Sequence, residues 1–240
     1  MAFTFIASAT HTINASGTII DCSSPLNVAA GDLLVAWFRF ENVTTTATIA
    51  DTVGGNVFTM DTLQSNGADF FSRLGYVLSA TENATSTFRG TLAVAGYSRR
   101  IVVMQFRPDA GDTVTLDNST GPATGSSTAI ASTAITTTGT DEVVFCGAST
   151  YSTATYSVQS INSVAADGIV SPAGDANTWY RILSSTFTNG TGTATSSVNG
   201  KWICNIAAFK STASGGGGVT YPQLERGMRG IERGVYSGGL

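Results

Sequence analysis

Apolar and polar positions along most of the chain follow the short-period patterns of β-strands. Residues 31–40 begin as a continuous apolar run and end in alternation, which is typical of a core strand that leaves a sandwich at one end. Residues 70–78 and 100–106 are two further predicted strands. Between Phe3 and Phe209 no window sustains the i, i+3, i+4, i+7 apolar spacing of a helix. Clusters of glycine, asparagine and aspartate predict turns at 53–56, 65–67 and 188–190. This part of the chain is therefore predicted to be all-β.

Three sequence matches, in the same order in both halves, indicate an internal duplication. DLLVAW at 32–37 matches DEVVFC at 141–146, YVLS at 76–79 resembles YRILS at 180–184, and IVVMQF at 101–106 parallels CNIAAF at 204–209. The half-repeats extend over about 19–108 and 128–211. We favour one two-sheet, jelly-roll-like β-sandwich over two tandem domains, because residues 107–112 have the composition of a turn rather than of an interdomain linker.

The sandwich body is predicted to span 1–212, followed by a glycine-rich linker at 213–219 and a C-terminal tail at 220–240. The tail has the apolar period of a helix. At about 100° per residue, four aliphatic side chains fall on one face beside a tyrosine, and three arginines form a second stripe. The predicted partner-binding residues are Tyr221, Leu224, Arg226, Met228, Arg229, Ile231, Arg233 and Val235.

This predicted helix needs a surface on which to lie. Thr220 and Gln223 fit a capping box, and Pro222 falls in the first turn, where no backbone donor is lost. Three interior glycines each cost about 1 kcal/mol relative to alanine, so the helix should not persist alone in water. A frayed terminus is the ordinary alternative for such a segment. We predict a short helix that docks on a partner protein, because an apolar stripe between the arginines suits a protein groove better than nucleic acid.

The charge is divided unevenly between the body and the tail. Residues 1–212 carry nine Lys plus Arg against fourteen Asp plus Glu, and 213–240 carry three Arg against two Glu, giving net charges of −5 and +1. An acidic body argues against nucleic-acid binding, which needs a basic face. Charged residues make up only 12% of the chain, but 42% is hydrophobic, so we expect a folded body with Thr and Ser on its exposed strand faces rather than disorder.

Residues that carry catalytic or metal chemistry are few and unpatterned. His11, the only histidine, has no accompanying nucleophile motif, and no zinc, P-loop or dinucleotide motif occurs. Paired carboxylates remain candidates by default at Glu41, Asp61, Asp69 and Glu82. Oxygen ligands for calcium at 109–112 and 117–118 lack a calcium-loop pattern, so turns are the preferred interpretation. Cys22, Cys146 and Cys204 are predicted to be buried and free. We expect a protein that is not an enzyme and has no cofactor or metal.

Tryptophans offer the one hint of a glycan site. Trp37 and Trp202 lie inside apolar strands and are predicted to be core residues. Trp179 follows the polar segment 174–178, where an exposed indole could stack on a sugar. Loops around Asn42 and Asn66 would complete such a site.

The first residues show neither a basic region nor a long apolar region of a secretory signal, and no apolar run approaches the ~20 residues that span a bilayer. The expectation is a protein that is made in a host cytoplasm and does not enter a membrane.

Three short motifs carry a family resemblance. VAAGDLLVA at 28–36, YVLSA at 76–80 and ENATSTF at 82–88 resemble a β-sandwich family of tailed-phage virion proteins and some bacterial surface proteins, and the ERGMRG run in the tail is similar to C-terminal pegs of phage structural proteins. The resemblance covers about 20–210, but DTVGGN at 51–56 stands where the family often has a Pro-x-Gly-Trp loop. It implies a structural role in a virion and no catalysis.

The preferred expectation is a capsid decoration or minor capsid protein that its tail anchors to other virion proteins of the capsid or tail. The alternative is a tail-associated, carbohydrate-binding adhesin that recognises a receptor. Location on the head or the tail, copy number and self-association as a homo-oligomer stay open at this stage.

Overall fold

The computed structural model describes residues 3–41, 43–67 and 70–213, and over these ranges it contains strands and no helix. The all-β fold with sheets packed face to face is thus confirmed. The predicted linker and docking helix, apart from residue 213, lie outside the described residues.

The strands of the first half are β1 (Phe3–Ile13), β2 (Gly17–Asp21), β3 (Leu26–Val28), β4 (Leu33–Glu41), β5 (Ala47–Asp51), β6 (Thr59–Met60), β7 (Gln64–Ser65), β8 (Phe70–Val77), β9 (Asn83–Ser86) and β10 (Phe88–Pro108). Those of the second half are β11 (Asp112–Ala131), β12 (Glu142–Thr150), β13 (Tyr156–Ile161), β14 (Val164–Ala165), β15 (Gly168–Ala173), β16 (Ala176–Leu183) and β17 (Gly192–Ala213).

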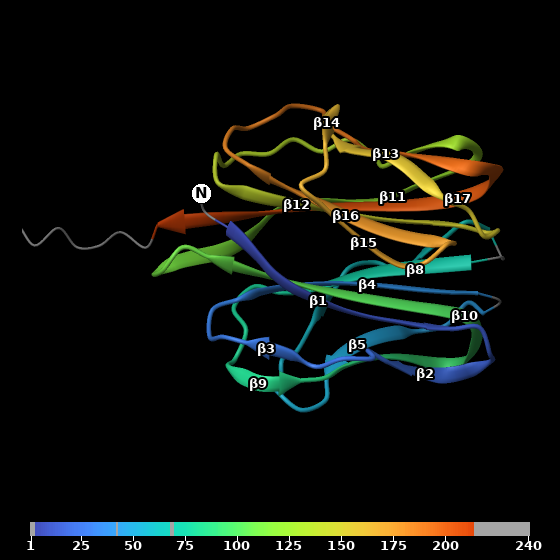
Figure 1. Cartoon of the computed structure of the whole chain (residues 1–240), viewed down its shortest axis with the longest axis horizontal. Coiled ribbons are helices and arrows are strands. Elements are labelled where there is room, and N and C mark those ends of the chain that lie inside the picture. Colours follow the sequence, from blue (N-terminus) through green and yellow to red (C-terminus); the bar gives the residue numbers. More distant parts are fainter. Residues whose placement is uncertain (1–2, 42, 68–69, 214–240) are drawn as a thin grey trace, which may run out of the picture.

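The two halves arrange corresponding strands in the same order. In the first half the path is β1-β10-β4-β8-β6, and in the second β11 pairs with β17 and the path continues as β17-β12-β16-β15. All of these pairings are antiparallel. We call these the inner sheets, because they face each other across the middle of the molecule (Figure 1).

One long strand in each half belongs to two layers. The first part of β10, Phe88 to Leu92, pairs with β2 and β5 in an outer layer, and its later part, from Arg100 to Phe106, pairs with β4 in the inner sheet. The register shifts between these parts, and Ser98 there has a φ of 47°. In β17 the first part pairs with β13 and the later part with β12. Each half therefore folds over itself as a small sandwich.

Three hydrophobic clusters fill the spaces between the layers. Alternation along β4 shows how: Val35 and Trp37 belong to the central cluster between the inner sheets, whereas Ala36 and Phe38 belong to the cluster inside the first half. A third cluster, which includes Trp179, fills the second half. The continuous apolar run of this strand thus follows from burial on both faces.

Strand pairing shows which residues of the two halves correspond. Phe106 lies opposite Leu33 and Phe209 opposite Val143, so the two phenylalanines correspond, as the sequence matches predict. Tyr76 and Tyr180 likewise pair with corresponding positions of β4 and β12.

The first sequence match is wrong by one residue. With Leu33 equivalent to Val143, the structural counterpart of Asp32 is Glu142 rather than Asp141. The reason is burial: Asp32 and Glu142 are both fully buried at the start of their strands, whereas Asp141 is exposed.

The connection between the halves is a tight turn, as predicted. The N–H of Asp112 donates to the carbonyl of Asp109, and Gly111 adopts a φ of 87° that favours glycine. The predicted turns at 65–67 and 188–190 also contain positive φ values, at Gly67 and Asn189.

Candidate functional site

The residues that the sequence singles out for partner binding cannot be placed. Tyr221, Leu224, Arg226, Met228, Arg229, Ile231, Arg233 and Val235 all lie outside the described residues. The body itself offers two candidate sites, an apolar groove and a buried network of charges. Neither is visible in the sequence patterns.

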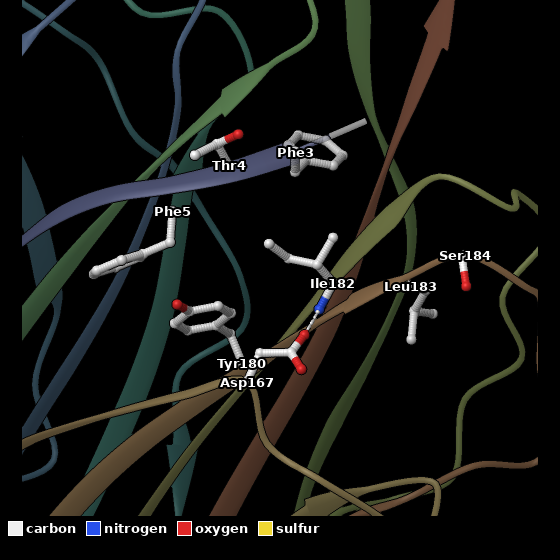
Figure 2. Close-up of a pocket in the computed structure, with 8 residues that line it drawn as sticks. All are labelled: Phe3, Thr4, Phe5, Asp167, Tyr180, Ile182, Leu183 and Ser184. Carbon is white, nitrogen blue, oxygen red and sulfur yellow. Dashed lines mark hydrogen bonds between the residues drawn. The ribbon is translucent and has the colours of Figure 1, made fainter. Parts of the chain in front are cut away.

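The groove lies between β1, an edge strand of one inner sheet, and the end of β16 in the other (Figure 2). It encloses about 470 Å³. Its lining residues are Phe3, Thr4, Phe5, Asp167, Tyr180, Ile182, Leu183 and Ser184, and we call it the β1–β16 groove.

Aromatic packing shapes the floor of this groove. The rings of Phe5 and Tyr180 stack with centroids 5.0 Å apart, and Tyr180 meets Phe106 edge-on at 5.0 Å. A register shift between Phe5 and Ala7 interrupts the pairing of β1 with β10 at this point. The groove therefore has a preformed aromatic floor to which both halves contribute.

One carboxylate and three hydroxyl-bearing residues line the groove beside its apolar floor. Oδ2 of the exposed Asp167 accepts a hydrogen bond from the N–H of Ile182 at 2.6 Å. Burial, together with the negative charge of Asp167, raises the pKa of the Tyr180 hydroxyl. Thr4 and Ser184 are exposed at the groove. Such a site suits an apolar side chain that has a cation beside it.

The groove lies at the end of the body where the described chain stops. Phe3 pairs with Pro108 at the end of β10, and Asp112, just after the connecting turn, pairs with Ala213 at the end of β17 (Figure 1). The start of β1, the turn and the last described residue thus share one end of the molecule.

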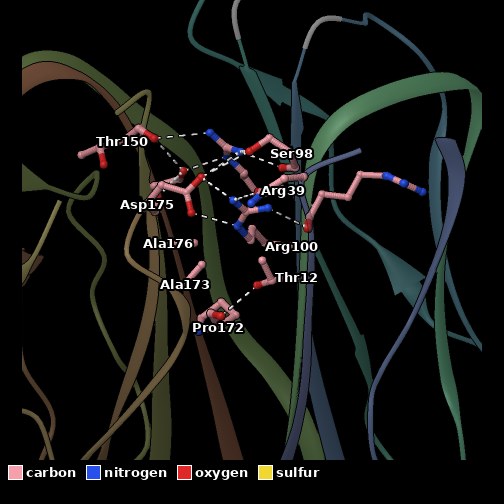
Figure 3. A network of polar contacts seen from close by, with 12 residues as sticks. Thr12, Arg39, Ser98, Arg100, Thr150, Pro172, Ala173, Asp175 and Ala176 are labelled. Carbon is pink, nitrogen blue, oxygen red and sulfur yellow. Dashed lines mark hydrogen bonds and ion pairs between the residues drawn. The ribbon is translucent and has the colours of Figure 1, made fainter. Parts of the chain in front are cut away.

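The buried charges lie at the boundary of the two halves, around Asp175 in the β15–β16 turn (Figure 3). Asp175 bridges two guanidinium groups from the first half: Nε of Arg100 at 2.8 Å and Nη1 of Arg39 at 3.2 Å. The Arg39 side chain has no exposed surface and is also paired with Glu41. Burial lowers the pKa of Arg39, and the charges of Asp175 and Glu41 oppose that effect.

Hydrogen bonds complete this network. Nε of Arg39 donates to Ser149 Oγ at 2.9 Å, and Nη1 donates to the Ser98 carbonyl at 2.7 Å. Nη2 of Arg100 donates to Asn14 Oδ1 at 2.7 Å, and the Tyr156 hydroxyl donates to the Asp175 carbonyl at 3.1 Å. Two positive and two negative charges are thus matched and hydrogen-bonded, which is the arrangement that buried charges require. The network joins the two halves.

A second polar cluster lies at the start of β12. Gly139 N–H donates to the buried Glu142 carboxylate, while Asp117 accepts from Thr138 and pairs with Lys210 Nζ at 3.1 Å. Burial, reinforced by the neighbouring Asp117 charge, raises the pKa of Glu142 to about 7. One oxygen of Glu142 has no hydrogen-bond donor.

The other candidate residues have structural surroundings. His11 Nδ1 contacts the carbonyl of Asp21, and Glu41 is engaged by Arg39. Asp61 bonds the N–H of Thr62 through Oδ1. Among the described residues, no hydrogen bond or ion pair engages the Glu82 carboxylate, and Asp69 lies outside the described ranges. The three cysteines are buried and free, as predicted.

Trp37 and Trp202 are buried as predicted, but the interpretation of Trp179 as a stacking surface is wrong. Its side chain is fully buried in the core of the second half, and its indole N–H donates to the Ser160 carbonyl at 3.2 Å. Residues 176–178 already belong to β16 and are buried, so Trp179 lies inside a core strand rather than beside an exposed loop. Asn66 ties the halves together by donating to the Gly125 carbonyl, and Asn42 lies outside the described residues.

Over the described ranges, no three His, Cys, Asp or Glu side chains gather as metal ligands. A search of the same residues finds no helix long and apolar enough to cross a membrane. Sequence reasoning missed the groove because its two walls are far apart in the chain, and the alternation of Phe3 and Phe5 marks a strand without showing what that strand faces. No protein-family model, no curated protein and no solved structure matches this chain.

Proposed function

We propose that this protein is a non-enzymatic structural component of a phage particle, in the role of a capsid decoration or minor capsid protein. The β-sandwich body is displayed on the particle, and the C-terminal tail holds it there by contacting other virion proteins.

The motifs that carry the family resemblance have clear structural roles in this body. Gly31 adopts a φ of 86° in the turn that leads into β4, and the buried Asp32 accepts hydrogen bonds from Arg107 Nε at 2.8 Å and from the N–H of Ala29 at 2.8 Å. Tyr76 lies on β8, and the ENATSTF segment forms β9 and enters β10 at the buried Phe88. Because these motif residues form turns, buried polar contacts and core strands, they support the proposal that this body has the same sandwich scaffold as the phage family that it resembles.

The observation that carries the proposal is the position of Ala213, the last described residue. β17 runs the length of the inner sheet and delivers Ala213 to one end of the body, so the following tail starts from that end (Figure 1). A body that its tail tethers at one end can present its remaining surface outward. The net charges of −5 and +1 would orient the tail toward an acidic neighbour.

The apolar stripe of the tail is expected to decide the affinity. Burying four aliphatic side chains contributes on the order of 6 kcal/mol before the cost of ordering the segment. Exposed arginine pairs contribute less than about 1 kcal/mol each. The arginines would therefore tune orientation.

Particle incorporation tests the proposal. Leu224→Asp with Ile231→Asp should abolish incorporation into purified particles, whereas Arg229→Ala with Arg233→Ala should reduce it only modestly. Mass-spectrometric stoichiometry reports both outcomes and the copy number, and hundreds of copies would indicate capsid decoration. Normal attachment of the aspartate variant with loss of the alanine variant would replace groove docking by electrostatic or nucleic-acid binding.

A further inference from the structure

We propose that, in the free protein, the β1–β16 groove binds the apolar stripe of the same chain's C-terminal tail, the residues Tyr221, Leu224, Met228, Ile231 and Val235. Docking within one chain would cover both apolar surfaces until a virion partner competes for the tail.

The groove has the chemistry that this segment needs. Five of its eight lining residues are aromatic or aliphatic, and its volume of about 470 Å³ falls within the range of ~300–1,000 Å³ in which protein pockets bury apolar groups. Phe5 and Ile182 are half-buried in the described chain, so each keeps apolar surface that a further side chain can cover. Uncovered apolar surfaces of this kind favour association.

Charge favours the same occupant. Asp167 places an exposed carboxylate at the groove, and the body as a whole carries −5. In the tail, Arg226, Arg229 and Arg233 alternate with the apolar stripe, so a guanidinium can approach Asp167 while an aliphatic side chain enters the groove.

The chain is long enough to reach the groove. Ala213 pairs with Asp112, which follows the turn after Pro108, and Pro108 pairs with Phe3 in the groove wall. The seven residues 214–220 can span up to about 23 Å when extended. A connection of only seven residues gives an effective concentration in the millimolar range, so even a weak contact is populated.

Disulfide trapping in the full-length chain tests this contact. Gln223→Cys lies next to the stripe without removing it, and Ser184→Cys lies exposed at the groove. The matched control is Thr140→Cys with Gln223→Cys. Thr140 is exposed at the same end of the body, beside Asp141, whose carbonyl accepts from Ser211 N–H near the end of β17. The native cysteines are all buried and should not compete.

Under mild oxidation at low protein concentration, the Ser184 pair should form at least about fivefold more intrachain disulfide than the Thr140 pair, because random encounters of a tethered tail would not favour the groove. Adding Leu224→Asp and Ile231→Asp should bring the Ser184 yield down to that of the control. Peptide mass spectrometry measures both yields.

Equal yields at the two positions would overturn the proposal. So would an interchain disulfide that grows with protein concentration, since it would assign the groove to the tail of a second copy. The measurement uses the free protein, so its failure is distinguishable from a failure of particle incorporation.

Discussion

At the scale of single residues, we expect substitutions among the buried charges to change the free energy of unfolding most. Asp175→Asn would leave the guanidinium groups of Arg39 and Arg100 buried without their shared counter-charge. We expect the free energy of unfolding to fall by about 3–5 kcal/mol, measured by urea denaturation. The control is Arg89→Ala, which breaks an ion pair with Asp21 whose side chains are 40% and 41% exposed and should leave stability unchanged. Equal effects of the two substitutions would show that the network at the boundary is dispensable.

The raised pKa of Glu142 leads us to expect that the stability of the protein depends on pH. Its pKa is raised from 4.5 to about 7 in the folded protein, so between these values the folded state binds the proton more tightly than the unfolded state. Stability should therefore fall as pH rises from about 5 to 8, and Glu142→Gln should remove this slope and stabilise the protein at pH 8 by on the order of 2 kcal/mol. Urea unfolding at both pH values checks the sign. A slope that persists in the Gln variant would assign the effect to another group.

At the scale of the element, a glycine on β12, Gly147, leaves room for the indole of Trp37 from the first half. A Cβ added at Gly147 would lie 2.7 Å from Cδ1 of Trp37, whose indole N–H donates to Asn205 Oδ1 at 3.0 Å. Gly147→Ala should therefore cost about 1–3 kcal/mol through overpacking. Gly200→Ala on β17 is the control, because its Cβ would meet nothing closer than 4.0 Å. In thermal melts, Gly147→Ala should have a clearly lower melting temperature than Gly200→Ala. Equal melting temperatures would mean that Trp37 can move aside without loss of stability.

Strands could be predicted from the sequence because their apolar pattern is local. Contacts between residues that are far apart in the chain could not be predicted in this way. The strands at 70–78 and 100–106 follow from their apolar runs. Arg39, at the alternating end of the first predicted strand, was expected where the chain leaves the core, yet it is fully buried because its counter-charge Asp175 is brought from the other half. The pattern near Trp179 failed for a related reason: the polar residues Asn177 and Thr178 are buried in β16, and their composition does not show that they form a core strand.

At the scale of the whole molecule, the central cluster holds residues of both halves, so we expect the two halves to unfold as one cooperative unit. Trp37 and Phe106 of the first half pack there with Phe145 and Phe209 of the second. A chain that ends at Ala213 should remain soluble and melt in a single transition, since every described strand precedes that point. Circular dichroism and calorimetry would measure it. An insoluble product would place the tail in the core, and two separate transitions would show that the halves unfold independently.

The long pairing of β17 has a mechanical consequence. Its register with β11 runs from Ala213 opposite Asp112 to Thr193 opposite Ala131, and β12 flanks its later part on the other side. A pull applied at Ala213 along the strand axis strains these hydrogen bonds together, in shear, instead of opening them one after another. A body tethered through this strand would resist detachment forces that act along it far better than forces that peel the strand sideways from its neighbours.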